Sequence, residues 1–296
     1  MILVTGATGY VGSRIVQKLV EQGREVRVIA RDVAAARAKL PAGATVVAGD
    51  VTAPDTLPAA MAGVDTVINL VAIIRETHGA TFERLNYQST VFAVDAARKA
   101  GVRRWLQMSA LGAMPNPQFP YHDTKYRAEE YVKRSGLDWT IFRPSIIFGP
   151  GDQFFTTLYG LAKLPAPFPL PGGGVAQFQP IWLWDVVDAF IGALDDPHTV
   201  GQTYDLGGPQ VMSYREMVGI MMDATHTHRP LLSLPIPLIQ PAAFLFDKIL
   251  PKPPVTPEQL KMLQVNNSST HSATASLIHR TPRALEDGLD YLTAKG

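Results

Sequence analysis

The chain opens on a short apolar run and continues as Thr5-Gly6-Ala7-Thr8-Gly9-Tyr10-Val11-Gly12. Three glycines at this spacing, after a strand and at the start of a helix, permit a tight turn and close approach of a pyrophosphate. The helix start adds N–H donors and the positive end of a dipole. We therefore predict a dinucleotide-binding loop, with cofactor contacts from Gly6, Thr8, Gly9, Tyr10, Val11 and Gly12.

Behind this loop, β-branched runs alternate with helical stretches through the first half of the chain. We predict strands over Ile2–Thr5, Glu25–Ala30, Thr45–Ala48, Thr66–Val71, Trp105–Ser109 and Thr140–Arg143. We predict helices over Ser13–Gln22, Ala34–Leu40, Leu57–Ala62, Phe82–Ala100 and Asp123–Ser135. Strands that alternate with helices indicate an α/β fold with a Rossmann-type, doubly wound parallel sheet. We expect about seven strands in the order 3-2-1-4-5-6-7, with Thr203–Leu206 as the last.

The second half has a different composition, with a Pro/Gly-rich loop over Pro165–Gly174 and helices at Phe154–Leu164, Trp184–Leu194 and from Ser213 onward. We expect a dinucleotide-binding domain over residues 1–150, completed by 181–206, and a smaller mixed substrate or partner lobe over 151–296. The apolar stretch Leu231–Leu250 contains three prolines, which we expect to break a helix there.

Composition excludes several classes of function. The 296 residues are 46% hydrophobic and 18% charged, which suits a globular protein with a sizeable core. Lys and Arg number 27 against 26 Asp and Glu, so we expect no nucleic-acid binding through a strong positive field. The chain has no cysteine, which excludes thiol nucleophiles and disulfides, and its seven histidines show no metal-ligand spacing, so we expect no metal. We also expect no secretory signal and a cytoplasmic location.

The end of the second predicted strand bears on the choice of dinucleotide. An NAD site usually has an acidic residue there for the ribose hydroxyl, but this chain has Ala30 followed by Arg31. An arginine can pair with a 2′-phosphate, so we favour NADP(H) over NAD(H). Arg31 as a solvated cation, and Asp32 reaching the ribose, remain alternatives. Asp50 and Val51 follow the third strand near the expected adenine, although Asp50 also suits a turn.

Three further residues form a candidate catalytic set. Tyr121 and Lys125 are four residues apart on a predicted helix and so share one face, and Ser109 ends the fifth strand. A tyrosine has an ordinary pKa near 10, and a neighbouring ammonium group would lower it toward a useful range. The other interpretation is an ordinary amphipathic helix, because this spacing is common by chance.

Together with the glycine loop, these residues resemble the short-chain dehydrogenase/reductase superfamily in its extended or atypical branch. The resemblance covers essentially the whole chain. It includes the segments Met108–Ala113, Tyr121–Lys125, Arg143–Asp152 and Gln179–Ile181. These segments are similar to the nucleotide-binding accessory subunit of respiratory complex I and to bacterial NAD-dependent epimerase/dehydratase-like proteins.

The resemblance implies specific roles. Tyr121 would be the acid/base, Lys125 would lower its pKa and hold the nicotinamide ribose, and Ser109 would orient the substrate oxygen. Leu70 and Ala72, at the end of the fourth strand, and Pro144 would line the cofactor. The loop Ile73–Ala80, which contains His78, would lie beside the nicotinamide. In the complex I subunit the resemblance implies NADPH as a structural cofactor without established turnover.

Three functions remain open at this point. The first is an NADP(H)-dependent oxidoreductase acting on a small, mainly apolar carbonyl or quinone-like substrate. The second is a non-catalytic NADPH-binding accessory or assembly protein, with peripheral membrane or protein contact through residues 231–250. The third is a nucleotide-sugar epimerase or dehydratase, which the scarcity of basic residues disfavours, since Lys163 is the one Lys or Arg between Pro144 and Tyr214.

Overall fold

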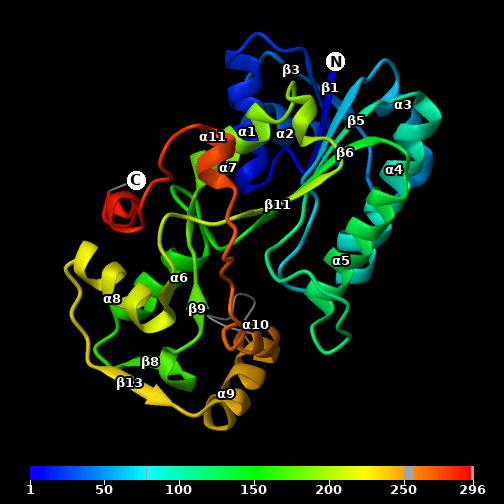
Figure 1. The fold of residues 1–296 in the computed structure, drawn as a ribbon. Helices are drawn as coiled ribbons and strands as arrows, with labels where there is room; N and C mark the ends of the chain where they lie inside the picture. Colours follow the sequence, from blue (N-terminus) through cyan, green and yellow to red (C-terminus); the bar gives the residue numbers. More distant parts are fainter. Residues whose placement is uncertain (78, 250–255, 295–296) are drawn as a thin grey trace. The chain divides into compact units, whose positions relative to one another are not determined.

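The computed structural model describes residues 1–77, 79–249 and 256–294, and its central feature is a seven-stranded sheet (Figure 1). The strands are β1 (Ile2–Thr5), β2 (Val26–Ala30), β3 (Ala44–Ala48), β4 (Thr66–Asn69), β5 (Arg104–Met108), β6 (Asp138–Pro144) and β11 (Gln202–Leu206). Their order is β11-β6-β5-β4-β1-β2-β3, so the predicted fold class and strand order are confirmed. His78 of the predicted nicotinamide loop and Leu250 lie outside the described residues.

The strand pairings from β3 through β6 are all parallel. In this register Thr5 at the end of β1 lies opposite Asn69 at the end of β4, and Asn69 lies opposite Gln107 of β5. All four residues of β1 are buried, as expected for a parallel strand that helices cover on both faces. The carboxyl ends of these strands therefore meet along one edge of the sheet.

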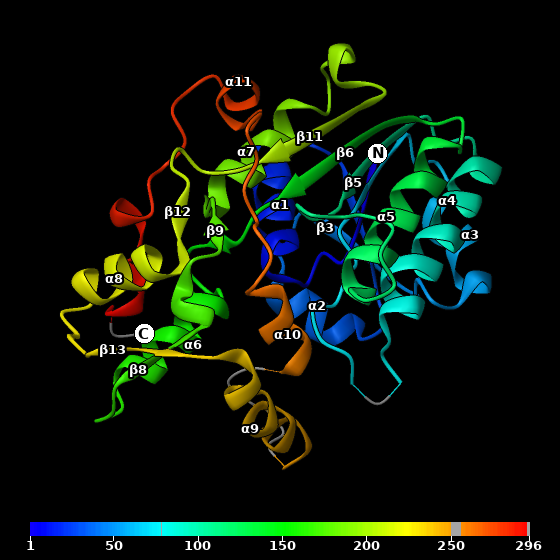
Figure 2. The ribbon, with the colours of Figure 1, turned by 60° about the horizontal axis from the view of Figure 1, so that its bottom comes forward.

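Helices cover both faces of this sheet. They are α1 (Tyr10–Glu21), α2 (Val33–Lys39), α3 (Leu57–Met61), α4 (Ser89–Ala100), α5 (Pro120–Lys133), α7 (Leu183–Gly192) and α11 (Thr274–Ile278). Figures 1 and 2 show α3, α4 and α5 together on one face, with α1 on the other. Short 3-10 turns add η1 (Pro54–Thr56) and η4 (Pro197–Thr199).

Two helices begin differently from the predictions. Helix α5 starts at Pro120 and not at Asp123, because proline suits the first helical position, where no N–H donor is needed. The predicted helix Phe82–Ala100 opens as a π-helix, η2 (Glu83–Gln88), before α4. Within η2, the Asn86 amide accepts from the Ile73 nitrogen at 2.8 Å and donates to its oxygen at 3.2 Å. The π-helix thus anchors the loop that follows β4.

The chain divides into two compact units. The first comprises residues 1–144, 186–205 and 276–279, and the other described residues form the second. The second unit contains β7 (Ile147–Phe148), α6 (Phe154–Ala162), β8 (Phe168–Pro171), η3 (Gly172–Gly174), β9 (Gln177–Phe178), β10 (Ile181–Trp182), β12 (Met212–Ser213), α8 (Tyr214–Ala224), β13 (Leu231–Leu234), α9 (Ile236–Ile249), α10 (Pro257–Met262), η5 (Glu286–Gly288) and η6 (Asp290–Leu292). The strands pair two by two, as β10-β7, β12-β9 and β13-β8.

Aromatic and methionine side chains form the core of the second unit. The buried cluster includes Phe148, Phe155, Phe168, Phe178, Trp182, Met217 and Met221. Helix α8 packs into this cluster and begins at the predicted place, with a capping box between Ser213 and Glu216. These aromatic residues are therefore core residues of the second unit.

The proline-rich stretch from Leu231 does form a helix, contrary to our prediction. Helix α9 runs over Ile236–Ile249 with Pro241 inside it. Pro237 is the second helical residue, where the missing N–H donor has no intrahelical partner to lose, so only Pro241 removes a helical hydrogen bond. Among the described residues, no helix combines the length and apolar composition needed to cross a bilayer.

Candidate active site at the carboxyl ends of the strands

The glycine loop has the close backbone contacts that its spacing predicts. Gly6 has a φ of +69°, and a Cβ there would lie 3.0 Å from the carbonyl carbon of Leu70. A Cβ at Gly12 would lie 2.3 Å from the Gly6 oxygen, which no real side chain tolerates. Gly9 is the N-cap of α1 and has no side chain to cap the helix, so the first N–H groups are not blocked by one. This cradle fits the pyrophosphate of a dinucleotide.

Besides Arg31, a lysine supplies a positive charge near the glycine loop. Lys39, in the last turn of α2, donates from Nζ to the main-chain oxygen of Thr8 at 2.6 Å. Arg31 follows β2 and is exposed. Asp32 is the N-cap of α2, since its carboxylate accepts from the Ala35 nitrogen at 2.9 Å. Lys39 is not among the predicted site residues, and the one sequence signal for it is a basic residue in the last turn of a short helix beside the loop.

Asp50 has a local structural role. It follows β3, and its carboxylate accepts from the nitrogen and hydroxyl of Thr52 at 2.8 and 2.9 Å. Its main-chain nitrogen donates to the Thr56 hydroxyl at 3.0 Å. These bonds close a turn, which is the alternative that the sequence left open. Val51 is half-buried and packs against the core under α3 and α4.

The remaining predicted cofactor residues also follow strand ends. Leu70 and Ala72 follow β4, and the Leu70 backbone contacts Gly6. Pro144 ends β6 and accepts from the Leu111 nitrogen at 3.0 Å. Apart from Lys125 on α5, the predicted cofactor residues come from the loops after β1, β2, β3 and β4, from the start of α1 and from the last residue of β6, all at the same end of the sheet.

Lys125 lies beside the segment that carries Ser109. Ser109 directly follows β5, and its main-chain nitrogen donates to the Phe142 oxygen at 2.7 Å. Lys125 is 1% exposed and donates from Nζ to the oxygen of Met108, the residue before Ser109, at 2.6 Å. Tyr121 is buried one helical turn before Lys125. The structure thus places Lys125 directly beside the Ser109 segment, on the same helix as Tyr121.

Burial is the dominant electrostatic effect on this set. It raises the pKa of Tyr121 to about 12 and lowers the pKa of Lys125 to about 8. The lowering at Lys125 is opposed by the negative charge of Glu129, one turn further along α5. Glu129 is fully buried and accepts two hydrogen bonds from Arg143, at 2.9 and 2.5 Å. A lowering of the Tyr121 pKa by Lys125 and an oxidised nicotinamide stays a prediction.

A buried chain of hydrogen bonds connects this site to the glycine loop. The Thr5 hydroxyl donates to the Asn69 side-chain oxygen at 2.5 Å, and the Asn69 amide donates to the Gln107 side-chain oxygen at 3.0 Å. The Gln107 amide then donates to the Met108 oxygen at 3.2 Å, the same oxygen that accepts from Lys125. Gln107 is not among the predicted site residues, because residue type alone does not distinguish a polar residue within a predicted strand.

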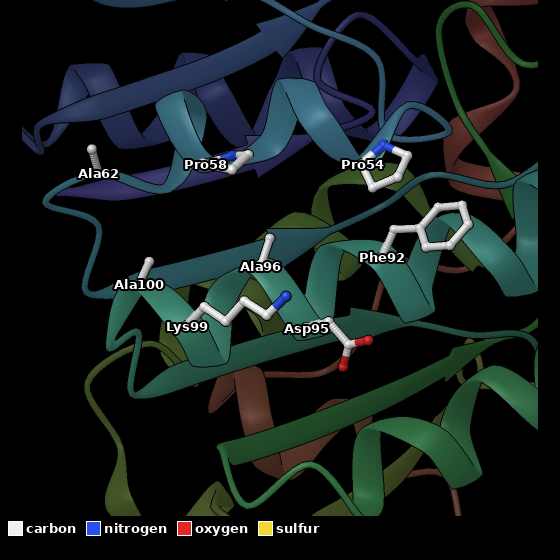
Figure 3. Close-up of a pocket in the computed structure, with 8 residues that line it drawn as sticks. All are labelled: Pro54, Pro58, Ala62, Phe92, Asp95, Ala96, Lys99 and Ala100. Carbon is white, nitrogen blue, oxygen red and sulfur yellow. The ribbon is translucent and has the colours of Figure 1, made fainter.

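A hollow of about 420 Å³ lies elsewhere on the first unit, between α3 and α4 (Figure 3). Its lining residues are Pro54, Pro58, Ala62, Phe92, Asp95, Ala96, Lys99 and Ala100. None of the predicted catalytic or cofactor residues is among them. The hollow is open and mostly apolar, and it is separate from the residues considered above.

Comparisons with known proteins agree with this geometry. The family model described as NAD(P)H-binding matches residues 6–160. A relative from Arabidopsis thaliana, NADH dehydrogenase [ubiquinone] 1 alpha subcomplex subunit 9, is 32% identical over 90% of this chain and 69% of its own length. An NAD(P)H azoreductase from Xenophilus azovorans is 28% identical over 76% of this chain and 73% of its own.

Solved structures share the fold. A nucleoside-diphosphate-sugar epimerase from Staphylococcus aureus superposes with a TM-score of 0.78 and covers 98% of this chain and 99% of its own, at 19% identity. At that identity the likeness establishes the architecture alone. The glycine cradle, the strand order, the family model and the complex I relative all agree, and the chain belongs to the NAD(P)H-binding family with an extended short-chain dehydrogenase/reductase fold.

Proposed function

We propose that the chain is an NADP(H)-dependent oxidoreductase acting on a small, mainly apolar carbonyl or quinone-like substrate. One observation carries the proposal: the Ser109 hydroxyl is buried and has no hydrogen-bond partner within the described part of the chain. A buried polar atom of this kind requires a partner, which a substrate oxygen would supply. Lys125 is held at the adjacent residue, and Tyr121 lies on the same helix.

The roles of the side chains follow from their chemistry. A bound reduced nicotinamide supplies a hydride to the carbonyl carbon. Tyr121 donates its phenolic proton to the carbonyl oxygen, which yields an alcohol or, from a quinone, a hydroquinone. Ser109 donates a hydrogen bond that orients that oxygen. With a pKa of about 8, Lys125 is mostly protonated at neutral pH and favours the tyrosinate that remains until solvent returns a proton.

Preference for NADP(H) is the finer part of the proposal. Arg31 is exposed directly after β2, at the predicted position of the adenosine ribose. Asp32 is engaged as the cap of α2, which leaves Arg31 and not a carboxylate to meet the 2′ position. Lys39 adds a second positive charge at the Thr8 oxygen. These charges favour a 2′-phosphate over a 2′-hydroxyl.

Cofactor exchange followed by a substrate screen tests this function. The protein is loaded with NADPH, excess NADP⁺ is added, and the loss of bound nicotinamide fluorescence is followed. We expect release within seconds to minutes and NADPH oxidation by at least one member of a carbonyl and quinone series. NADPH that stays bound for hours, with no oxidation by any member, would contradict a cosubstrate role.

A second candidate is a non-catalytic NADPH-binding accessory or assembly protein in the cytoplasm, located peripherally at the inner face of a membrane. The observation that favours it is the exposure of large apolar side chains on α9 and β13. These are Leu232, Leu238, Phe244, Leu245 and Ile249, between 47% and 70% exposed. Exposed apolar groups so close together are typical of protein or membrane contact, and the relative from Arabidopsis thaliana is named as a complex I subunit.

Vesicle binding tests the membrane form of this second candidate. Sedimentation with phosphatidylethanolamine/phosphatidylglycerol vesicles is compared between the wild type and a Leu238→Gln, Ile249→Gln double variant. Val211→Gln, at a 51% exposed apolar residue outside β13 and α9, is the matched control. Loss of binding in the double variant alone supports the contact, and equal binding by all three proteins opposes it.

Nucleotide-sugar chemistry remains the least favoured alternative. Basic side chains in the second unit are engaged locally: Lys163 lies 4.0 Å from the centre of the Tyr159 ring, and Arg215 donates to the Gly173 oxygen and the Ser233 hydroxyl. A diphosphate would need several such cations. Micromolar binding of a UDP- or dTDP-sugar would restore this alternative.

A further inference from the structure

A second buried polar side chain without a partner lies next to the candidate catalytic tyrosine. His122 directly follows Tyr121 in α5 and is only 5% exposed. Its imidazole makes no hydrogen bond to any described residue; its contacts are the edge of the Tyr121 ring, at 5.3 Å between centres, and the Phe119 ring, at 6.1 Å. The side chain is buried, but its ring nitrogens are not among the unpaired atoms that are fully closed off from solvent, so a small ligand can reach them.

The loop after Ser109 is shaped around this imidazole. Gly112 has a φ of +88°, and a Cβ at that position would lie 3.3 Å from Nε2 of His122. Gly112 is three residues beyond Ser109, whose hydroxyl is also buried and lacks a partner among the described residues. Two unpaired polar groups therefore border the same short loop, and Tyr121 joins them through its ring contact with His122.

The charge state of His122 limits what it can bind. Burial lowers the pKa of this imidazole below its ordinary value, so at neutral pH the ring is uncharged. A neutral imidazole has one N–H donor and one acceptor nitrogen. Such a group forms good hydrogen bonds with a hydroxyl or carbonyl oxygen. Carboxylates and phosphates bind more strongly to cationic donors, so they are less suitable partners for a neutral ring.

We propose that His122 is a specificity-determining residue that hydrogen-bonds a second, uncharged oxygen of the substrate, next to the carbonyl that Ser109 and Tyr121 engage. The substrate class is then a vicinal dicarbonyl or α-hydroxycarbonyl compound with an apolar remainder. The proposal rests on the proposed oxidoreductase function. In the reaction, the hydride from NADPH and the proton from Tyr121 convert one carbonyl to an alcohol, while His122 holds the other oxygen and exchanges no electrons.

A matched pair of probes tests this inference. 1-Phenyl-1,2-propanedione has two adjacent carbonyls, and propiophenone is the same skeleton with one. The wild type should prefer the dione in kcat/KM by about 100-fold or more, because a site with a buried donor discriminates strongly against a substrate that leaves it unpaired. In His122→Phe, which keeps an aromatic ring without its nitrogens, this preference should fall about tenfold or more.

Two further variants separate hydrogen bonding from packing. His122→Gln keeps a donor and an acceptor and should recover part of the preference for the dione. Phe119→Leu reduces the packing on the imidazole but removes no polar atom, so it should change the rates of both probes by a similar factor. An unaltered preference in His122→Phe, with NADPH binding intact, would overturn the proposal.

Imidazole ¹⁵N resonances provide a readout that does not need turnover. The His122 signals are identified by their loss in His122→Gln, and the NADPH-loaded wild type is titrated with each probe. We expect shifts with the dione and none with propiophenone. Shifts without NADPH oxidation would keep the binding role and reject the oxidoreductase function. Oxidation of NADPH without a shift would keep the function and reject the role of His122.

Discussion

The ammonium group of Lys125 donates to the main-chain oxygen of Met108 at 2.6 Å, so strand β5 fixes the position of this lysine from within the protein. The same oxygen accepts from the Gln107 amide at 3.2 Å. Because Met108 directly precedes Ser109, one backbone segment sets the spacing of Lys125 and the candidate substrate-orienting hydroxyl. Lys125 and Ser109 are therefore expected to respond together when β5 is disturbed.

The buried amine should make folding stability rise with pH in the alkaline range. The pKa of Lys125 is about 8 in the folded protein, against 10.5 for an unperturbed lysine. Between these values the unfolded chain binds more protons than the folded one, so the free energy of unfolding increases with pH. The full effect is about 3 kcal/mol. Urea unfolding gives the free energy of unfolding of the wild type and of Lys125→Met at pH 7.5 and at pH 10. The change in the difference between the two proteins, from one pH to the other, measures the contribution of Lys125.

Other groups titrate in this range in both proteins, and the comparison cancels them. Lys99→Met, at an exposed lysine of α4, serves as the control and should follow the wild type at both pH values. A difference between wild type and Lys125→Met that stays constant from pH 7.5 to 10 would mean that the amine keeps its ordinary pKa.

Removing the Tyr121 hydroxyl should abolish turnover without loss of the cofactor. Tyr121→Phe keeps the edge contact with Phe82, whose ring centre lies 5.8 Å away, and deletes the proton donor. We expect kcat to fall by about 10²–10⁴. Steady-state NADPH oxidation and fluorescence titration measure the two effects. Tyr126→Phe, on the same helix, is the control, and a Tyr121→Phe variant that still turns over at the wild-type rate would end the assignment.

A methyl group at Gly12 should destroy the phosphate cradle. In Gly12→Ala the new Cβ would approach the Gly6 oxygen to 2.3 Å, so the loop must move. We expect loss of NADPH binding by about 100-fold or more, since the helix N–H groups no longer point at the pyrophosphate. Gly160→Ala is the matched control, because a Cβ at that helical position would meet no atom within 4 Å beyond the neighbouring backbone of its own helix. Equal NADPH affinity of the two variants would refute the cradle.

Arg31 should control the choice between the two dinucleotides. In Arg31→Gln we expect the affinity for NADPH to fall about tenfold and that for NADH to change little, because a charge-assisted bond to the 2′-phosphate is lost. Arg37→Gln, at an exposed position on α2, should change neither. Dissociation constants for both cofactors, measured at two salt concentrations, check this. If the affinities for NADPH and NADH fell by the same factor, Arg31 would attract both cofactors through its charge and would not distinguish the 2′-phosphate.

Gln107 should stabilise the sheet and the lysine together. Gln107→Leu removes the acceptor of the buried Trp105 indole N–H and one of the two acceptors of the Asn69 amide, which keeps only the Thr90 hydroxyl. An unpaired buried donor costs about 1–3 kcal/mol of folding free energy. The Met108 oxygen also loses one donor, so Lys125 should become more mobile and NADPH should bind more weakly. Chemical unfolding and cofactor titration measure both, with the exposed Gln118→Leu as control. Unchanged stability would show that the hydrogen-bond chain contributes nothing.

Much of the first unit could be predicted from the sequence, because local signals agree with the final packing. Gly23 and Gly101, both with φ above +60°, follow α1 and α4, which end within one residue of their predicted bounds. The strand order follows from the handedness of the crossovers. The predicted helix start at Asp123 left Tyr121 outside, and the observed start at Pro120 places Tyr121 and Lys125 on one helix, as their spacing requires.

What could not be predicted depends on partners distant in the sequence. Lys39 reaches Thr8 only because α2 folds back over the loop, and Gln107 is distinguished only by Asn69 and Met108. The helix over Ile236–Ile249 was missed because proline propensity was weighed without the position of each proline in the helix. The π-helix at Asn86 has no sequence signature that local propensity could detect.

The position of β11 beside β6 has a consequence for biosynthesis. The ribosome completes β6 at residue 144 but does not begin β11 until residue 202. During that interval β6 is an uncovered edge with free main-chain donors and acceptors, the kind of surface on which nascent chains associate wrongly. A fragment that stops near residue 150 would keep this edge permanently, so expression of the first domain alone should yield aggregates unless β11 is appended.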